Sequence, residues 1–269
     1  QMRMFGEANR LLVISTKRIC TMVWPRAIRE WSNFQHLSCA VAVGTPAQRL
    51  EAIRSGADVT LVNFENLPWL IEVLNGEWLW DTVICDESTR LKSLRIDSRV
   101  SSTGKEFLRQ SGGSSRAAAI ARLAHSKIRN WLNFTGTPCS NGLIDLWGQQ
   151  WFIDAGNALG RTFSSFEERW FRTVQVGQDA FARRLEPYPH ADPEIKALLR
   201  PTTITIEAKD FMDLPPLVKN TVPVALSKPA QKAYREMEKE FFLEWKGKEH
   251  EAVSAGSKSM KCRQIASGA

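Results

Sequence analysis

The stretches Val83-Ile84-Cys85-Asp86-Glu87-Ser88-Thr89 and Phe134-Thr135-Gly136-Thr137-Pro138 decide the fold that we expect for this chain. Each begins with the apolar run of a buried strand and ends in a polar loop, which is where an α/β sheet presents its chemistry. An acidic pair directly after a strand can hold a magnesium ion and orient a water molecule. Hydroxyls that flank a glycine after a second strand can hydrogen-bond to that acidic loop. The pair of stretches therefore predicts a nucleotide-hydrolysing site.

Around these stretches, short apolar runs alternate with segments of helical spacing. This alternation implies βαβ units and hence a largely parallel sheet. The polar residues 92–115, rich in Ser, Gly and Arg, predict a surface loop with a short helix. The expected strands cover residues 11–14, 38–43, 59–62, 82–85 and 131–134, and the expected helices cover 19–31, 46–55, 67–74 and 116–124.

After Pro138 the pattern becomes mainly helical, which indicates a helical insertion or subdomain. Alternating β-branched residues then predict two strands, Pro215-Pro216 marks a boundary, and an amphipathic helix and a flexible loop follow. The expected helices cover 143–152, 163–174, 193–199 and 228–245, the strands 202–207 and 222–226, and the loop 247–258.

The composition favours some classes of protein and argues against others. The 36 basic and 29 acidic side chains leave a net charge of +7, which suits a polyanionic partner. The five cysteines are scattered without a C-x-x-C pair, and the four histidines are isolated. This pattern argues against a disulfide framework and against metal binding by His or Cys. No segment has the length and hydrophobicity of a membrane span, so we expect no membrane partner.

The motifs resemble one protein family in content and order. The first group of matching residues is Asp86-Glu87-Ser88-Thr89 with Leu91-Lys92. The second group is Thr135-Gly136-Thr137-Pro138 with Asn141-Gly142 and Asp145-Leu146-Trp147. They resemble the motifs of the Swi/Snf-like branch of superfamily-two helicases and translocases. The form is most similar to phage-encoded members. Thr89 departs from the family's common Asp-Glu-x-His pattern. The resemblance implies an ATP-dependent DNA helicase or translocase with a RecA-like parallel sheet flanked by helices.

The resemblance also implies four parts of the chain. Residues 1–142 would form the first RecA-like lobe without its phosphate-loop portion, and residues 143–200 a helical insertion. Residues 201–226 would form a return strand and an inter-lobe linker, and residues 227–269 the start of a second lobe.

The resemblance assigns roles to individual residues. Asp86 would coordinate Mg²⁺ through water, and Glu87 would activate the water that attacks ATP. Coupling between nucleotide state and DNA is assigned to Thr135, Gly136 and Thr137. Sequence-independent contacts to the DNA backbone are assigned to Ser15, Thr16, Lys17 and Asn63.

Other parts of such a motor are not recognisable in the sequence. A phosphate loop of the form G-x-x-x-x-G-K-[ST] is absent, and the resemblance places it upstream of Gln1. The arginines that complete the site would come from the second lobe, so we expect residues 1–269 alone to be a fragment that is inactive as an ATPase. The location implied is the cytoplasm of a bacterium or a phage-infected host. An alternative remains open: a non-catalytic nucleic-acid-binding or scaffold module with a degenerate RecA-like fold.

Overall fold

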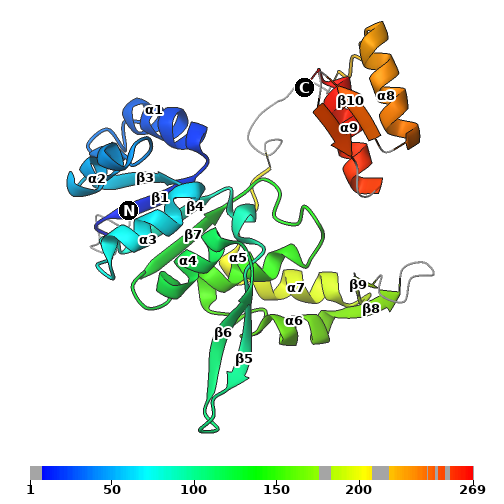
Figure 1. Cartoon of the computed structure of the whole chain (residues 1–269). Coiled ribbons are helices and arrows are strands. Elements are labelled where there is room, and N and C mark those ends of the chain that lie inside the picture. The colour runs from blue at the N-terminus through cyan, green and yellow to red at the C-terminus, as the bar shows by residue number, and fades with distance from the viewer. Residues whose placement is uncertain are drawn as a thin grey trace. The chain divides into compact units, whose positions relative to one another are not determined.

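The computed structural model describes residues 8–175, 183–207, 218–240, 242–245, 248–251 and 255–268. The chain divides into two compact units, of which the first ends at Ile204 and the second begins at Thr205. Each unit is described by itself (Figure 1). Within the described residues, no helix is both long enough and apolar enough to cross a membrane.

A parallel sheet of five strands forms the centre of the first unit. Its order is β2-β3-β1-β4-β7, so β1 lies in the middle and β7 at one edge. Every pair of neighbours is parallel, which confirms the expected sheet. Because the strands are parallel, their carboxyl ends meet at one edge, with Ser15 opposite Asn63 and Asp86 opposite Phe134. The strands are β1 (Leu11–Ser15), β2 (Cys39–Val41), β3 (Val59–Asn63), β4 (Thr82–Asp86) and β7 (Asn130–Phe134).

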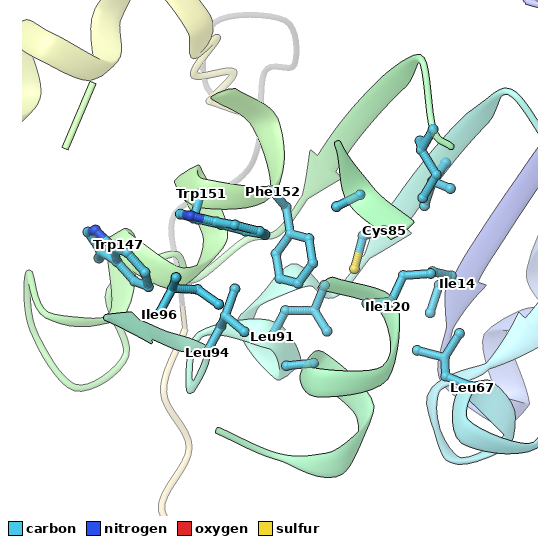
Figure 2. Packing of buried hydrophobic residues seen from close by; sticks show 14 of the residues in the cluster. Ile14, Leu67, Cys85, Leu91, Leu94, Ile96, Ile120, Trp147, Trp151 and Phe152 are labelled. Atoms are coloured by element: carbon cyan, nitrogen blue, oxygen red, sulfur yellow. The ribbon is translucent and has the colours of Figure 1, made fainter. Parts of the chain in front are cut away.

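Helices cover both faces of this sheet, which explains why its central strands read as continuous apolar runs. Successive residues of β1 alternate between two hydrophobic clusters: Leu12 and Ile14 belong to one, and Val13 to the other. The smaller cluster holds the helix α1 (Trp24–Glu30), which follows a π-helical turn, η1 (Ile19–Val23). The larger cluster holds α2 (Pro46–Arg54), α3 (Leu67–Leu74), α4 (Ser115–Ala124) and α5 (Asp145–Asp154). Figure 2 shows this packing, with Phe152 on one side of Cys85 and with Ile120 and Ile14 on the other.

The prediction of a loop with a short helix over residues 92–115 was wrong. The chain instead forms an antiparallel hairpin of β5 (Arg95–Val100) and β6 (Glu106–Gly112). Two 3-10 turns precede the hairpin in the chain, η2 (Phe64–Asn66) and η3 (Ser88–Leu91). The hairpin extends away from the sheet (Figure 1). Its base is held by the Arg95 guanidinium, 3.7 Å from the Phe163 ring centroid, and by hydrogen bonds from Ser164 to Asp97. A five-residue connection containing Gly104 between alternating segments was the available hairpin signal.

Residues 143–200 are only partly helical. They contain α5, α6 (Phe163–Trp170), a hairpin of β8 (Phe171–Gln175) and β9 (Arg183–Pro187), α7 (Ala191–Leu199) and the turn η4 (Arg200–Thr202). The predicted helix over 163–174 therefore ends early, because Phe171 to Gln175 pair with β9 instead. Trp147, Phe152, Phe166 and Trp170 are almost fully buried in the cluster that also packs on the sheet.

The two strands predicted over 202–207 and 222–226 were also wrong. Apart from Thr202, which ends η4, these residues form no regular element, and Ile204 and Val224 are 87% and 83% exposed. A strand needs a neighbour to bond its backbone groups, and no described strand pairs with either segment. The boundary expected at Pro215-Pro216 lies outside the described residues.

The described residues of the second unit form four elements. They are α8 (Lys228–Glu240), β10 (Phe242–Trp245), β11 (Lys248–Glu251) and α9 (Ala255–Ala266). Ala233 and Met237 of α8 pack with Cys262 of α9, and β10 pairs antiparallel with β11. The predicted helix over 228–245 is thus interrupted, and part of the predicted loop over 247–258 is strand and helix.

Candidate functional site

The candidate site lies at the carboxyl ends of β1 and β4, where the direction of the chain across the sheet reverses. From β1 the chain proceeds to β2 and β3 on one side, and from β4 it proceeds to β7 on the other. Ligands of open α/β sheets bind in the crevice outside such a switch point. Ser15 ends β1 and Asp86 ends β4, so both lie at this crevice.

Asp86 is half-buried and is oriented by two donors. Its Oδ2 accepts hydrogen bonds from Ser15 Oγ at 3.3 Å and from Trp24 Nε1 at 2.9 Å. Its Oδ1 accepts no hydrogen bond from the residues that the structure describes. One carboxylate oxygen is therefore fixed while the other is free to bind an external group.

Glu87 has a left-handed backbone, with φ 64° and ψ 52°. This conformation costs a residue with a Cβ about 1–2 kcal/mol relative to the right-handed region. It arises where the chain turns from β4 directly into η3. Strained residues of this kind cluster at functional sites. Glu87 is half-buried and directly follows Asp86, so both residues of the acidic pair lie at the carboxyl end of β4.

The donor set fits a partial magnesium site. Among the described residues, no three His, Cys, Asp or Glu side chains gather as a metal cage. Mg²⁺ commonly binds through one or two carboxylates and keeps water and phosphate oxygens as its other ligands. Asp86, with one oxygen oriented and the other free, meets that requirement.

Buried thiols beside the acidic pair are inert. Burial raises the pKa of Cys20 to about 12, and burial together with the charges of Asp86 and Glu87 raises the pKa of Cys85 well above its usual value. Both groups stay protonated at neutral pH, so neither is a nucleophile for this site.

The four residues expected to contact nucleic acid differ in exposure. Lys17 is exposed and Thr16 half-buried, but Ser15 is fully buried and Asn63 is 6% exposed. Ser15 orients Asp86, and Asn63 Nδ2 donates to Glu65 Oε2 at 2.8 Å. Thr16 and Lys17 alone have the exposure that a backbone contact requires.

The Asn63 contact also stabilises a small charged cluster. Burial alone would raise the pKa of Glu65. The hydrogen bond from Asn63 and the charges of Arg116 and Arg90 outweigh this effect, so the pKa of Glu65 is lowered. Arg116 and Arg90 lie 3.5 Å and 3.6 Å from Glu65 Oε1. Asn63 therefore has a structural partner at the end of β3.

Thr135, Gly136 and Thr137 form an open loop after β7. Thr135 Oγ1 accepts a hydrogen bond from the Thr137 amide at 3.1 Å, and a Cβ on Gly136 would meet nothing within 4 Å. In the described structure, no hydrogen bond joins these three residues to Asp86 or Glu87. The described residues therefore do not show the direct hydrogen bond between the two loops that the sequence suggested.

Helix α5 makes the link instead. Ser88 Oγ, next to the acidic pair, donates to Gln149 Oε1 at 2.7 Å. Gln149 Nε2 in turn donates to the Pro138 carbonyl at 2.8 Å, in the loop that follows Thr137. Gln149 is only 5% exposed, so one amide bridges the two loops inside the fold.

A second bridge runs through Asp145, also on α5. Lys92 Nζ donates to Asp145 Oδ2 at 2.9 Å, and that oxygen also accepts from Ser140 Oγ at 3.1 Å and from the Asn141 amide at 2.7 Å. Between the two bridges, a Cβ on Gly148 would lie 2.7 Å from the Lys92 carbonyl oxygen. The spacing of Asp145, Gly148 and Gln149 on one helical face was the signal that could have revealed this role.

Trp24 is a positioning residue to which the sequence assigned no role. Trp24→Phe removes the N–H donor to Asp86 and keeps an aromatic ring, so it should lower the free energy of unfolding by about 1.5 kcal/mol. Trp31→Phe is the matched control, because the exposed Trp31 indole has no hydrogen-bond partner among the described residues. Urea unfolding of both variants measures the difference. Equal stability losses would contradict the role of the Trp24 N–H group.

Comparison with known proteins finds similarity to a phage protein whose name states no function. No family model matches the chain. The chain is 38% identical over 265 residues to "Putative protein p41" of Acyrthosiphon pisum secondary endosymbiont phage 1. The match covers 98% of this chain and 54% of that protein, so the chain spans about half the length of the relative.

Proposed function

We propose that the chain is part of the first motor lobe of an ATP-dependent DNA helicase or translocase of the Swi/Snf-like type, with a RecA-like sheet. The observation that carries the proposal is the acidic pair at the switch point. Asp86 is oriented by Ser15 and Trp24, and Glu87 stands beside it in a strained backbone. Its cofactors would be ATP and Mg²⁺, its partners DNA and a second lobe, and its location the cytoplasm of a bacterium or phage-infected host.

The edge of β7 that faces away from β4 is where we would place the strand that precedes a phosphate loop. Among the described strands, β7 pairs with β4 alone. Helix α1 covers one face of the sheet, but not over β7. On that face, Phe134 is 45% exposed, and Ile84 and Leu132 are only half-buried. A further strand and helix would satisfy the β7 edge and cover these side chains. A phosphate loop between such a strand and helix would lie at the same carboxyl edge of the sheet as Asp86.

In the complete protein the two residues of the acidic pair would have different roles. Bound Mg²⁺ would supply charge neutralisation at the phosphates. Asp86 Oδ1 would face the ion's water shell while Ser15 and Trp24 hold Oδ2, and Glu87 would orient the attacking water and accept its proton. The bridges through Gln149 and Asp145 would transmit movement of the acidic loop to the residues after Thr137.

The non-catalytic alternative also has support, because the net charge of +7 and the exposed Lys17 suit nucleic-acid binding without hydrolysis. ATP hydrolysis distinguishes the two proposals.

The test is DNA-stimulated ATP hydrolysis by the complete protein. Asp86→Asn should lower kcat at least about 100-fold, because the amide cannot replace the charge of the carboxylate at the metal. Asp192→Asn, at a side chain that is 52% exposed and paired with Lys196 on the same helix, is the control and should retain activity. A wild-type protein without DNA-stimulated hydrolysis would support the non-catalytic module.

A further inference from the structure

An open groove lies beside Asp86, under the first helical segment after β1. Its volume is about 380 Å³. A second hollow of about 350 Å³ adjoins it, because Val23, Ala27 and Trp31 line both. The first hollow is completed by Trp24, Phe34 and Asp86, and the second reaches Arg18 and Arg26.

The rim of this groove exposes large apolar side chains. Trp31 is 64% exposed, Met22 61%, Val23 53% and Phe34 47%. The Phe34 amide donates to the Trp31 carbonyl at 2.8 Å, which fixes the two aromatic residues in one turn. Exposed apolar residues gathered in one patch mark a binding surface. Two aromatic rings beside a groove offer flat faces to a flat ligand.

The same segment is positively charged. Lys17, Arg18, Arg26 and Arg29 are opposed only by Glu30, which Arg26 approaches at 2.6 Å. Neither Lys17 nor Arg18 forms an ion pair with a residue that the structure describes. Asp86 carries the opposite charge at the inner end of the groove. An anionic ligand would therefore place its charges at the Arg18 end and its uncharged parts along Trp31 and Phe34.

We propose that this groove binds a single strand of nucleic acid, with unpaired bases stacked on Trp31 and Phe34 and phosphates beside Lys17 and Arg18. The proposal deepens the proposed function, on which it rests, by naming the form of nucleic acid. Bases in a duplex stack on each other and do not offer their faces, whereas unpaired bases stack readily on aromatic side chains. A strand also provides the repeated negative charge that this basic segment complements.

Trp24 connects the groove to Asp86 of the proposed hydrolytic site. Its ring lines the groove, and its Nε1 donates to Asp86 Oδ2. A base in the groove would pack against the ring whose N–H group orients the carboxylate. Occupancy of the groove would thereby restrict the motion of Asp86.

The experiment is a titration of a fluorescently labelled dT15 strand with the complete protein, followed by anisotropy. Trp31→Ala should weaken binding about 5- to 100-fold, because it removes one stacking face. Trp31→Phe should restore most of the affinity. Phe107→Ala is the matched control, since Phe107 is a comparably exposed aromatic residue on β6, away from the groove, at 45% exposure. An abasic strand of the same length should bind wild type and Trp31→Ala equally.

Several results would overturn the groove assignment. These are unchanged dT15 affinity in Trp31→Ala, an equal loss with the abasic strand, or an equal loss with duplex DNA. Displacement of dT15 by free ATP in a Trp31-dependent manner would mark a mononucleotide site instead. Loss of self-association in Trp31→Ala without a change in dT15 binding would mark a contact between copies of the chain. None of these results would alter the outcome for Asp86→Asn, so the two proposals can fail separately.

Discussion

Glu87→Gln should lower kcat for DNA-stimulated ATP hydrolysis by the complete protein about 10²–10⁴-fold, the contribution typical of a positioned general base. The amide keeps the size of the side chain and can still hydrogen-bond, but it cannot accept the proton of the attacking water. The backbone at Glu87 should stay as it is, so KM for ATP and the unfolding midpoint should change little. Steady-state kinetics and urea unfolding on the same preparations measure both.

The exposed Glu77→Gln is the control for this substitution and should leave kcat unchanged. If Glu87→Gln retained wild-type kcat, Glu87 would have no part in proton transfer. The backbone strain provides an independent check. Glu87→Gly should stabilise the fold by about 1 kcal/mol, because glycine adopts the left-handed conformation without the Cβ clash. Ala155→Gly, at φ 58°, should stabilise the fold similarly and keep activity.

The central sheet could be predicted from the sequence because its signal is local. Each strand is a short apolar run, and the acidic pair and the Thr-Gly-Thr-Pro segment follow two of those runs directly. Parallel pairing then brings their carboxyl ends to one edge. The position of Asp86 at that edge followed from these features alone.

The contacts of the site could not be predicted, because they depend on side chains that are distant in the sequence. Trp24 and Asp86 are 62 residues apart, and Ser88 and Gln149 are 61 apart. No periodicity shows that an indole N–H at the start of α1 reaches a carboxylate at the end of β4. Ser15 illustrates the consequence: a hydroxyl after a strand suits a phosphate contact, but burial directs this one to Asp86.

The strand predicted over residues 202–207 shows the converse error. Its β-branched alternation describes a segment suited to a sheet, but a strand forms only where a neighbour supplies hydrogen bonds. Ile204 and Ile206 are 87% and 71% exposed, and neither residue pairs with a strand that the structure describes. A local pattern can therefore be right about the preference of a segment and wrong about its structure.

Asp145→Ala should lower the free energy of unfolding by about 3 kcal/mol, the usual cost of breaking a buried ion pair. The Asp145 side chain is only 6% exposed, and its Oδ2 is the shared acceptor for Lys92, Ser140 and the Asn141 amide. Its removal leaves three donors without that acceptor. Lys92→Met should cost less, about 1.5 kcal/mol, because Asp145 keeps two donors and the Lys92 side chain is already 25% exposed.

A double-mutant cycle separates the Lys92–Asp145 interaction from these individual costs. The two losses should not add: the double variant should be more stable than their sum implies, by about 1 kcal/mol. Asp192→Ala with Lys196→Met supplies the control cycle, since that pair is exposed and should couple by less than about 0.5 kcal/mol. Additive losses at Lys92 and Asp145 would contradict a direct bridge between the acidic loop and the loop after Thr137. Because Gln149 forms the other bridge from the same helix, a coupled result would identify α5 as the element through which the two loops can move together.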